Sequence, residues 1–110
     1  MELTRGDTMW LKFQRKDLDG NPILEKASNI YFSVKQNNHI KDVVFQKTIG
    51  DMEFDEEGYY HFIIEPDDTN ALYYGNYTYD LEVKEDEYVK TIAKGILTLT
   101  EETTHKNNEV

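Results

Sequence analysis

The sequence predicts an all-β fold in which two sheets pack face to face as a sandwich. Apolar and polar residues alternate along most of the chain, which is the pattern of strands that bury one face in a core. Aromatic residues make up 13% of the sequence, and their rings suit the half-buried surface of a pleated strand. Short stretches of Gly, Asn and Asp separate the alternating segments, as expected of turns between strands.

The first half of the chain contains five predicted strands, and the alternation is clear in the first. In the first of them Met9, Leu11 and Phe13 are apolar. Lys12 and Gln14, which alternate with these residues, are polar. Strands are therefore expected at residues 8–15, 30–35, 43–47, 52–54 and 59–65, with turn formers at 17–22 and 55–58.

A short helix is expected at residues 67–73, between two of the predicted strands. Pro66 suits the first position of a helix, where its missing N–H has no partner to lose. Asp67 and Asp68 favour the positive N-terminal end of the helix dipole, and Gly75 suits the exit. A helix of about two turns is too short to form a layer of its own, so we expect it to be a connector.

The second half of the chain returns to alternation in two long strands that meet at an acidic turn, residues 85–87. On the first strand the side chains expected to face the core are Tyr77, Tyr79, Leu81 and Val83. On the second strand, residues 88–100, they are Val89, Thr91, Ala93, Gly95, Leu97 and Leu99. A glycine in the middle of a strand often marks a bulge or kink, so we expect one at Gly95.

About seven strands separated by polar turns indicate a two-sheet Greek-key sandwich with one short connector helix. A small closed barrel is the alternative architecture. The length of 110 residues fits a single domain, which we place at residues 1–100. Residues 101–110 have little apolar content and are expected to form a flexible tail.

The charge of the chain limits its partners. It carries 22 acidic and 12 basic residues, a net charge of −10. Such a field repels phosphate groups, so we expect no nucleic-acid partner and no membrane partner. No apolar run is long enough for a signal peptide or a transmembrane segment. The acidic clusters at residues 51–57, 65–68 and 82–87 are expected to form a solvated rim, with a cation site as the alternative if they meet.

No catalytic, cofactor-binding or metal-binding residues are predicted, and we expect no enzymatic activity. The spacing of Asp17, Asp19 and Asn21 is that of a calcium-loop start, but Pro22 and Ser28 occupy the positions that need Gly and Glu. The chain has no cysteine, and its three histidines lack the spacing of metal ligands on one element. No serine has the neighbouring base that a nucleophile requires.

Three aromatic residues are predicted to lie on the outer faces of the sheets. Trp10 has the parity of the polar positions of its strand, and Tyr31 and Tyr59 also fall on the outer sides of theirs. Exposed aromatic side chains anchor protein interfaces or stack on sugars. We therefore take these three residues as the candidate interface. The other interpretation is that a β-bulge or the rim of the core buries them.

Several motifs give the chain a family resemblance. The Asp-Gly-Asn-Pro turn at residues 19–22, ahead of the strand at 30–34, resembles the start of bacterial immunoglobulin-like domains. Residues 68–72, followed by Gly-Asn-Tyr at 75–77, resemble the crossing between the two sheets of such domains. The resemblance implies an immunoglobulin-like sandwich in which the hydroxyl of Tyr77 ties down the crossing loop as a tyrosine corner.

Taken in order, the motifs at residues 5–8, 17–22, 65–69, 75–80 and 91–100 are similar to a narrower group. These are small tail or baseplate structural proteins from phages and prophages of Gram-positive bacteria, including the N-terminal domain of baseplate upper proteins. The resemblance implies a virion structural or assembly module that contacts other phage structural proteins or copies of itself, as in a homo-oligomer. It would reside in the virion, or in the bacterial cytoplasm before assembly. A carbohydrate- or host-surface-binding adhesion module is the alternative function.

Overall fold

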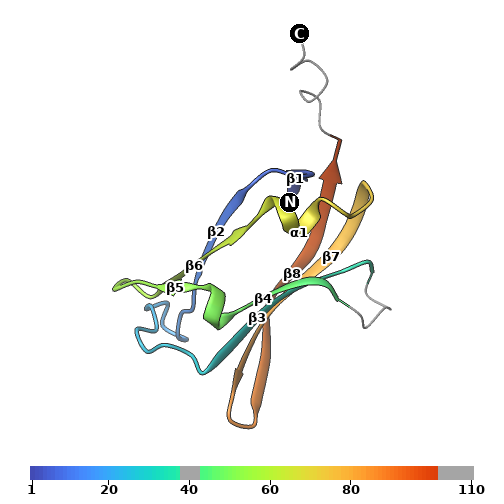
Figure 1. Cartoon of the computed structure of the whole chain (residues 1–110). Helices are drawn as coiled ribbons and strands as arrows, with labels where there is room; N and C mark the ends of the chain where they lie inside the picture. Colours follow the sequence, from blue (N-terminus) through green and yellow to red (C-terminus); the bar gives the residue numbers. More distant parts are fainter. Residues whose placement is uncertain (38–42, 102–110) are drawn as a thin grey trace.

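The computed structural model describes residues 1–37 and 43–101 and shows two stacked sheets (Figure 1). Five strands form one sheet in the order β1-β8-β7-β3-β4, and three form the other in the order β2-β6-β5. Over the described residues the strands are β1 (Glu2–Thr4), β2 (Met9–Gln14), β3 (Asn29–Lys35), β4 (Val43–Thr48), β5 (Glu53–Phe54), β6 (Tyr59–Ile64), β7 (Gly75–Glu85) and β8 (Tyr88–Thr100). Two short helices, η1 (Ile49–Asp51) and α1 (Pro66–Thr69), connect strands. The predicted all-β immunoglobulin-like sandwich is confirmed, and the two separate sheets exclude the closed barrel.

Strand pairing joins distant parts of the chain. β2 pairs antiparallel with β6, with Met9 opposite Ile64 at one end and Gln14 opposite Tyr59 at the other. β1 pairs parallel with the last residues of β8, where Leu3 lies opposite Leu99. β1 was not among the predicted strands, because three residues are too few to show an alternation and its partner lies at the other end of the chain.

Side chains from both sheets meet in a core rich in aromatic rings. Phe13 of β2 stacks on Tyr60 of β6 with ring centroids 4.9 Å apart, and Phe32 of β3 lies 5.0 Å from Phe62. Tyr60 is fully buried, and its hydroxyl accepts a hydrogen bond of 2.9 Å from the backbone N–H of Ala27. This bond avoids the cost of about 1–3 kcal/mol that an unpaired buried polar group would carry.

The crossing from β6 to β7 contains the predicted helix in a shorter form. α1 has four residues, and the carboxylate of Asp68 accepts a 2.7 Å hydrogen bond from the backbone N–H of Glu65 at its start. The chain then turns into β7 at Gly75, whose φ of 131° favours glycine. The hydroxyl of Tyr77 donates a 2.8 Å hydrogen bond to the carbonyl oxygen of Tyr73, so the expected tyrosine corner is confirmed.

The last strand differs from its predicted pattern. Its pairing with β7 passes from Leu81 opposite Ala93 to Glu82 opposite Thr91, which leaves Ile92 as an extra residue. Residues paired across a sheet share a face, so the extra residue turns the earlier part of β8 over. The expectation that Val89 and Thr91 face the core is therefore wrong, and both are exposed.

The bulge expected at Gly95 is also wrong in position, because the register shifts at Ile92 instead. Gly95 has a different purpose. A Cβ atom at this position would lie 2.8 Å from the hydroxyl oxygen and 3.0 Å from ring carbons of Tyr79 on β7. The glycine therefore leaves room for the tyrosine ring, which packs against the core beside Phe32 at a centroid distance of 5.6 Å.

The described part of the chain ends one residue after β8, so the predicted tail is covered only at Glu101, and residues 102–110 lie outside the described residues. Within residues 1–37 and 43–101, no helix combines the length and the apolar character that crossing a membrane would demand.

Candidate functional site

Trp10 stands on the outer face of the three-stranded sheet. Its neighbours Met9 and Leu11 point to the core, and the alternation of β2 turns the indole outward, where 75% of its surface is exposed. The cross-strand partner of Trp10 is Ile63 on β6. The outward residues of this sheet form a continuous surface, which we call the Trp10 face: Trp10, Lys12, Gln14, Glu53, Tyr59, His61 and Ile63.

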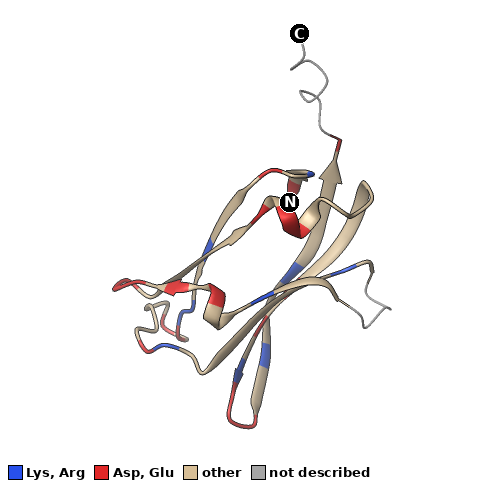
Figure 2. Cartoon of the chain, in the orientation of Figure 1, with Lys and Arg blue, Asp and Glu red and all other residues tan. Residues whose placement is uncertain are grey.

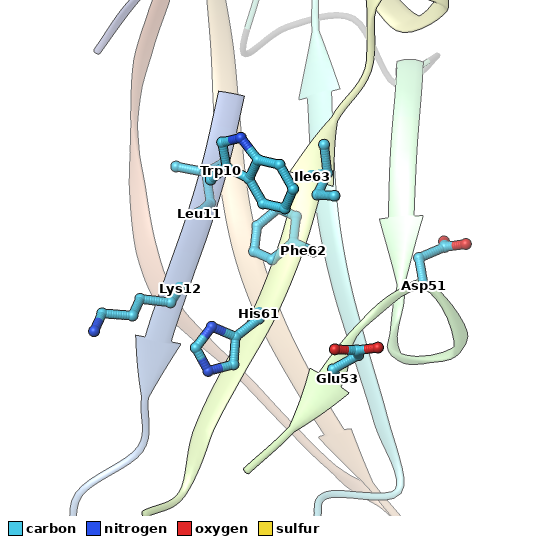
Figure 3. A pocket seen from close by; sticks show the side chains of 8 residues that line it. All are labelled: Trp10, Leu11, Lys12, Asp51, Glu53, His61, Phe62 and Ile63. Atoms are coloured by element: carbon cyan, nitrogen blue, oxygen red, sulfur yellow. The ribbon is translucent and has the colours of Figure 1, made fainter. Parts of the chain in front are cut away.

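The Trp10 face contains an open groove of about 550 Å³. Figure 3 shows the indole of Trp10 and the side chain of Ile63 together at one end of the groove. Lys12, His61 and Glu53 lie further along it, nearer the other end. The groove thus combines an apolar platform with side chains that donate and accept hydrogen bonds.

Tyr59 lies on the same face as Trp10 but at the other end of β6. Its partner on β2 is Gln14, four residues along the strand from Trp10, which corresponds to a separation of about 13 Å. The ammonium of Lys12 lies 4.6 Å from the centroid of the Tyr59 ring, a cation–π contact. Tyr59 is therefore half-buried by its neighbours, whereas Trp10 is not.

The structure does not bring Tyr31 together with the other two predicted aromatic residues. Tyr31 belongs to β3 and lies on the outer face of the five-stranded sheet, opposite Thr48 and Glu82. The surface around it is open and mostly polar, with the charged residues Asp80 and Lys84 nearby. The predicted interface therefore splits, with Trp10 and Tyr59 on one side of the sandwich and Tyr31 on the other.

An aspartate organises the turn that leads into β6. The carboxylate of Asp55 lies 2.8 Å from Nε2 of His61 and accepts backbone hydrogen bonds of 2.9 Å from Glu57 and Tyr59. The pKa of Asp55 is lowered below its ordinary value of 3.8, first by the hydrogen bond from His61 and then by that from the Tyr59 backbone. This pair holds the His61 ring at the edge of the Trp10 face.

Other acidic side chains also serve turns and helix ends. Asp51 accepts a 2.8 Å hydrogen bond from the backbone of Thr48 at the start of η1. Asp68, at the start of α1, makes an ion pair of 2.7 Å with Lys47. Asp17 accepts backbone hydrogen bonds of 2.9 Å from two residues of the turn at 17–22. This turn was the interpretation favoured over a calcium loop.

The acidic clusters do not converge on a common point in the described part of the chain. No three side chains of His, Cys, Asp or Glu come close enough there to hold a metal ion. Figure 2 shows the acidic residues spread along the rim of the sandwich, at the turns and at the tip of the β7–β8 hairpin. Two of the three histidines, His39 and His105, lie outside the described residues.

The exposed apolar side chains at the start of β8 were not predicted. The first residues of β8 expose Tyr88, Val89 and Ile92 to between 37% and 53%. The sequence alternation had assigned Val89 to the core, so its exposure could not be recognised before the extra residue at Ile92 was known. The available signal was the run of β-forming residues interrupted by lysines, which is typical of an edge strand.

Comparison of the chain with protein-family models, with curated proteins and with solved structures finds no match. The case for a function therefore depends on the residues of the chain itself.

Proposed function

We propose that this chain is a non-enzymatic structural or assembly module of a phage or prophage particle, part of a tail, baseplate or fibre. It acts through contacts with other structural proteins of the particle, or with copies of itself, and the Trp10 face is its contact surface. The viral part of the proposal is supported by the order of family-like motifs from residue 5 to residue 100. The choice of surface is supported by the structure around Trp10.

The exposure of Trp10 is the main reason for choosing the Trp10 face as the contact surface. Three quarters of the indole surface lies in water, so covering it with a partner stabilises the complex. Tryptophan is also enriched among the residues that dominate binding. The adjacent Ile63 enlarges the apolar centre, while Lys12, His61 and Glu53 supply a polar rim. An apolar centre with a polar rim is the usual composition of a protein–protein interface.

Trp10 also provides the experiment, because it is the only tryptophan in the chain. The purified chain is mixed with the protein products of the genes on either side of its own, and complexes are detected by light scattering after size exclusion. Burial of the indole should shift its fluorescence to shorter wavelength. Trp10→Ala should weaken the complex by about thirtyfold, since truncating a central aromatic anchor costs about 2 kcal/mol or more.

Leu18→Ala is the matched control. Leu18 is fully exposed in the turn between β2 and β3, away from the Trp10 face, and its truncation should leave the affinity within about twofold. A strict monomer without affinity for any of these products contradicts the proposal. A complex that is equally strong with Trp10→Ala contradicts the choice of surface.

A carbohydrate- or host-surface-binding module is the second candidate, favoured by the composition of the groove. Sugar rings stack on exposed indoles and need hydrogen-bonding groups around them, and Lys12, His61, Glu53 and Asp51 line the same groove as Trp10. A glycan array, followed by tryptophan fluorescence titration of any hit, tests this function. Silence in both measurements removes it.

A further inference from the structure

The two halves of β8 have different neighbours. Residues Thr98 to Thr100 are paired on one side with β7 and on the other with β1. Residues Tyr88 to Lys94 are paired with β7 alone, and no other described strand reaches their free side. In Figure 1 this part of the β7–β8 hairpin extends beyond the other strands. The hairpin therefore presents an open edge of backbone N–H and carbonyl groups.

The side chains of this open edge are unusually apolar for an exposed strand. All seven residues from Tyr88 to Lys94 are exposed, and among them are the large apolar side chains of Tyr88, Val89 and Ile92. Exposed edges of this kind readily pair with another extended segment, unless charges or Pro blunt them. Lys90, Lys94 and the extra residue at Ile92 also lie on this edge, and they limit pairing to segments whose charges match the lysines.

A cleft runs beside the open edge, between β8 and the end of β2. It has a volume of about 400 Å³, and its apolar lining includes Phe13, Ile23 and Val83. The charged residues in the lining are Arg15, Lys16 and Lys90, and no acidic residue is among them. In a chain with 22 acidic and 12 basic residues, this is a local reversal of charge.

The positive charge of the cleft is only partly neutralised within the chain. Arg15 makes an ion pair of 3.4 Å with Glu85, the hairpin-tip residue that ends β7. Lys16 and Lys90 have no ion pair among the described residues. Two uncompensated ammonium groups therefore flank an apolar cleft and an open strand edge.

We propose that this open edge of β8 receives an extended segment of a partner protein in which carboxylate and apolar side chains alternate. The segment adds to the five-stranded sheet beyond β8, along the line that β1 begins, and hydrogen-bonds to the free backbone groups. Because successive side chains of a strand point to opposite sides, the carboxylates face the cleft, where Lys16 and Lys90 lie, while the apolar side chains lie on the outer face beside Val89, the partner of Lys84. The proposal concerns a different surface from the Trp10 face and does not depend on it.

A second copy of this chain fits the edge less well than an acidic segment does. Two copies would bring together two net charges of −10, which repel each other. Pairing of two β8 edges would also bring Lys90 and Lys94 close to the same lysines of the second copy, and like charges across a sheet are destabilising. The lysines therefore oppose self-pairing and favour a carboxylate-bearing partner.

The test uses two ten-residue peptides with blocked ends, one alternating Glu with Val and the other alternating Lys with Val. Binding to the isotope-labelled chain is followed by amide chemical shifts and by hydrogen exchange. The Glu peptide should shift the amides of Tyr88 to Lys94 and slow their exchange, because added strand pairing protects them. The Lys peptide should bind at least about fivefold more weakly.

Charge-reversal variants identify the edge. Lys90→Glu should weaken binding of the Glu peptide by about fivefold. Lys84→Glu is the matched control, because Lys84 lies on the same hairpin but lines the outer surface near Tyr31, and it should leave the affinity within about twofold. Both lysines carry exposed side chains, so thermal melting should show that both variants fold.

Four results would overturn the proposal: no binding of the Glu peptide, equal binding of both peptides, shifts confined to other strands, or equal effects of the two variants. Self-association of the chain with protection of the same amides would also overturn it, since the occupant would then be a second copy. None of these results bears on Trp10→Ala, so this proposal and the proposed function can fail separately.

Discussion

The two halves of β8 show how differently one strand can be used. Leu97 and Leu99, in the half beside β1, are almost completely buried, whereas Val89 and Ile92 in the other half are 52% and 37% exposed. Both halves pair with β7 and both are rich in β-forming residues. The difference has two causes: the extra residue at Ile92 turns Val89 to the outer face, and the three-stranded sheet and β1 enclose only the covered half.

This difference teaches that hydrophobicity along a strand does not by itself define a core. An apolar side chain becomes buried only where a second layer faces it, and the β7–β8 hairpin extends past that layer (Figure 1). The covered half supplies stability. The open half is available for contact, at a place where the acidic chain has a basic cleft.

The largest expected effect compares the two halves directly. Leu97→Ala should lower the free energy of unfolding by about 2–5 kcal/mol, because it removes fully buried methyl groups and leaves a cavity. Val89→Ala should lower it by less than about 1 kcal/mol, since the side chain is half in water. Urea unfolding of both variants measures the difference. Equal losses would mean that the open half is buried in solution.

A second variant tests the close approach at the junction of the two halves. Gly95→Ala should cost about 1–3 kcal/mol, because the new Cβ would overlap the ring of Tyr79. Gly50→Ala should change the free energy of unfolding by less than about 0.5 kcal/mol, since its nearest contact would be an ordinary 3.8 Å. In a Tyr79→Ala background the Gly95→Ala penalty should vanish, and a persistent penalty would contradict the steric explanation.

Removing the tyrosine corner tests how much this hydrogen bond stabilises the fold near the covered half of β8. Tyr77→Phe should cost about 1 kcal/mol, because it removes the hydroxyl that binds the carbonyl oxygen of Tyr73. Tyr73→Phe is the control, since it keeps that carbonyl and alters only an exposed hydroxyl. Thermal melting should separate the two variants. Equal melting temperatures would show that the corner contributes nothing measurable.

The smallest effect concerns the exposed pair of Asp55 and His61, which lies away from both halves. The lowered pKa of Asp55 means that the folded chain keeps this carboxylate ionised at a pH where the unfolded chain binds a proton. Its contribution to stability is therefore present above pH 3.8, the ordinary pKa of the group, and is lost as the pH falls through the lowered pKa. NMR titration of the Asp55 carboxyl should show the depression, and His61→Gln should raise its pKa toward the ordinary value. An unchanged pKa in that variant would assign the depression to the backbone hydrogen bonds.

Much of the fold could be predicted because its signals are local. The alternation of Met9, Leu11 and Phe13 placed β2 and also turned Trp10 outward, and both predictions are confirmed. Pro66 placed the start of α1 correctly. The alternation on β8 failed at Ile92, because one extra residue in a strand reverses every assignment before it and leaves no mark in the residue types.

The candidate site was predicted only as separate residues. Trp10 and Tyr59 are 49 positions apart by their numbers, and they share a face because β2 pairs with β6. Tyr31 has the same outward parity but belongs to the other sheet. Parity says which side of its own strand a residue occupies, and it carries no information about which sheet the strand joins.

The sequence by itself determined that this chain is made of strands, where most of them begin and end, and that Trp10 points away from the core. These properties follow from the period of the backbone and from the chemistry of neighbouring residues. Only the tertiary structure decided which strands pair, which aromatic residues share a face and where β8 is left uncovered. Those outcomes depend on contacts between distant residues, whose free energies exist only once both sheets are assembled.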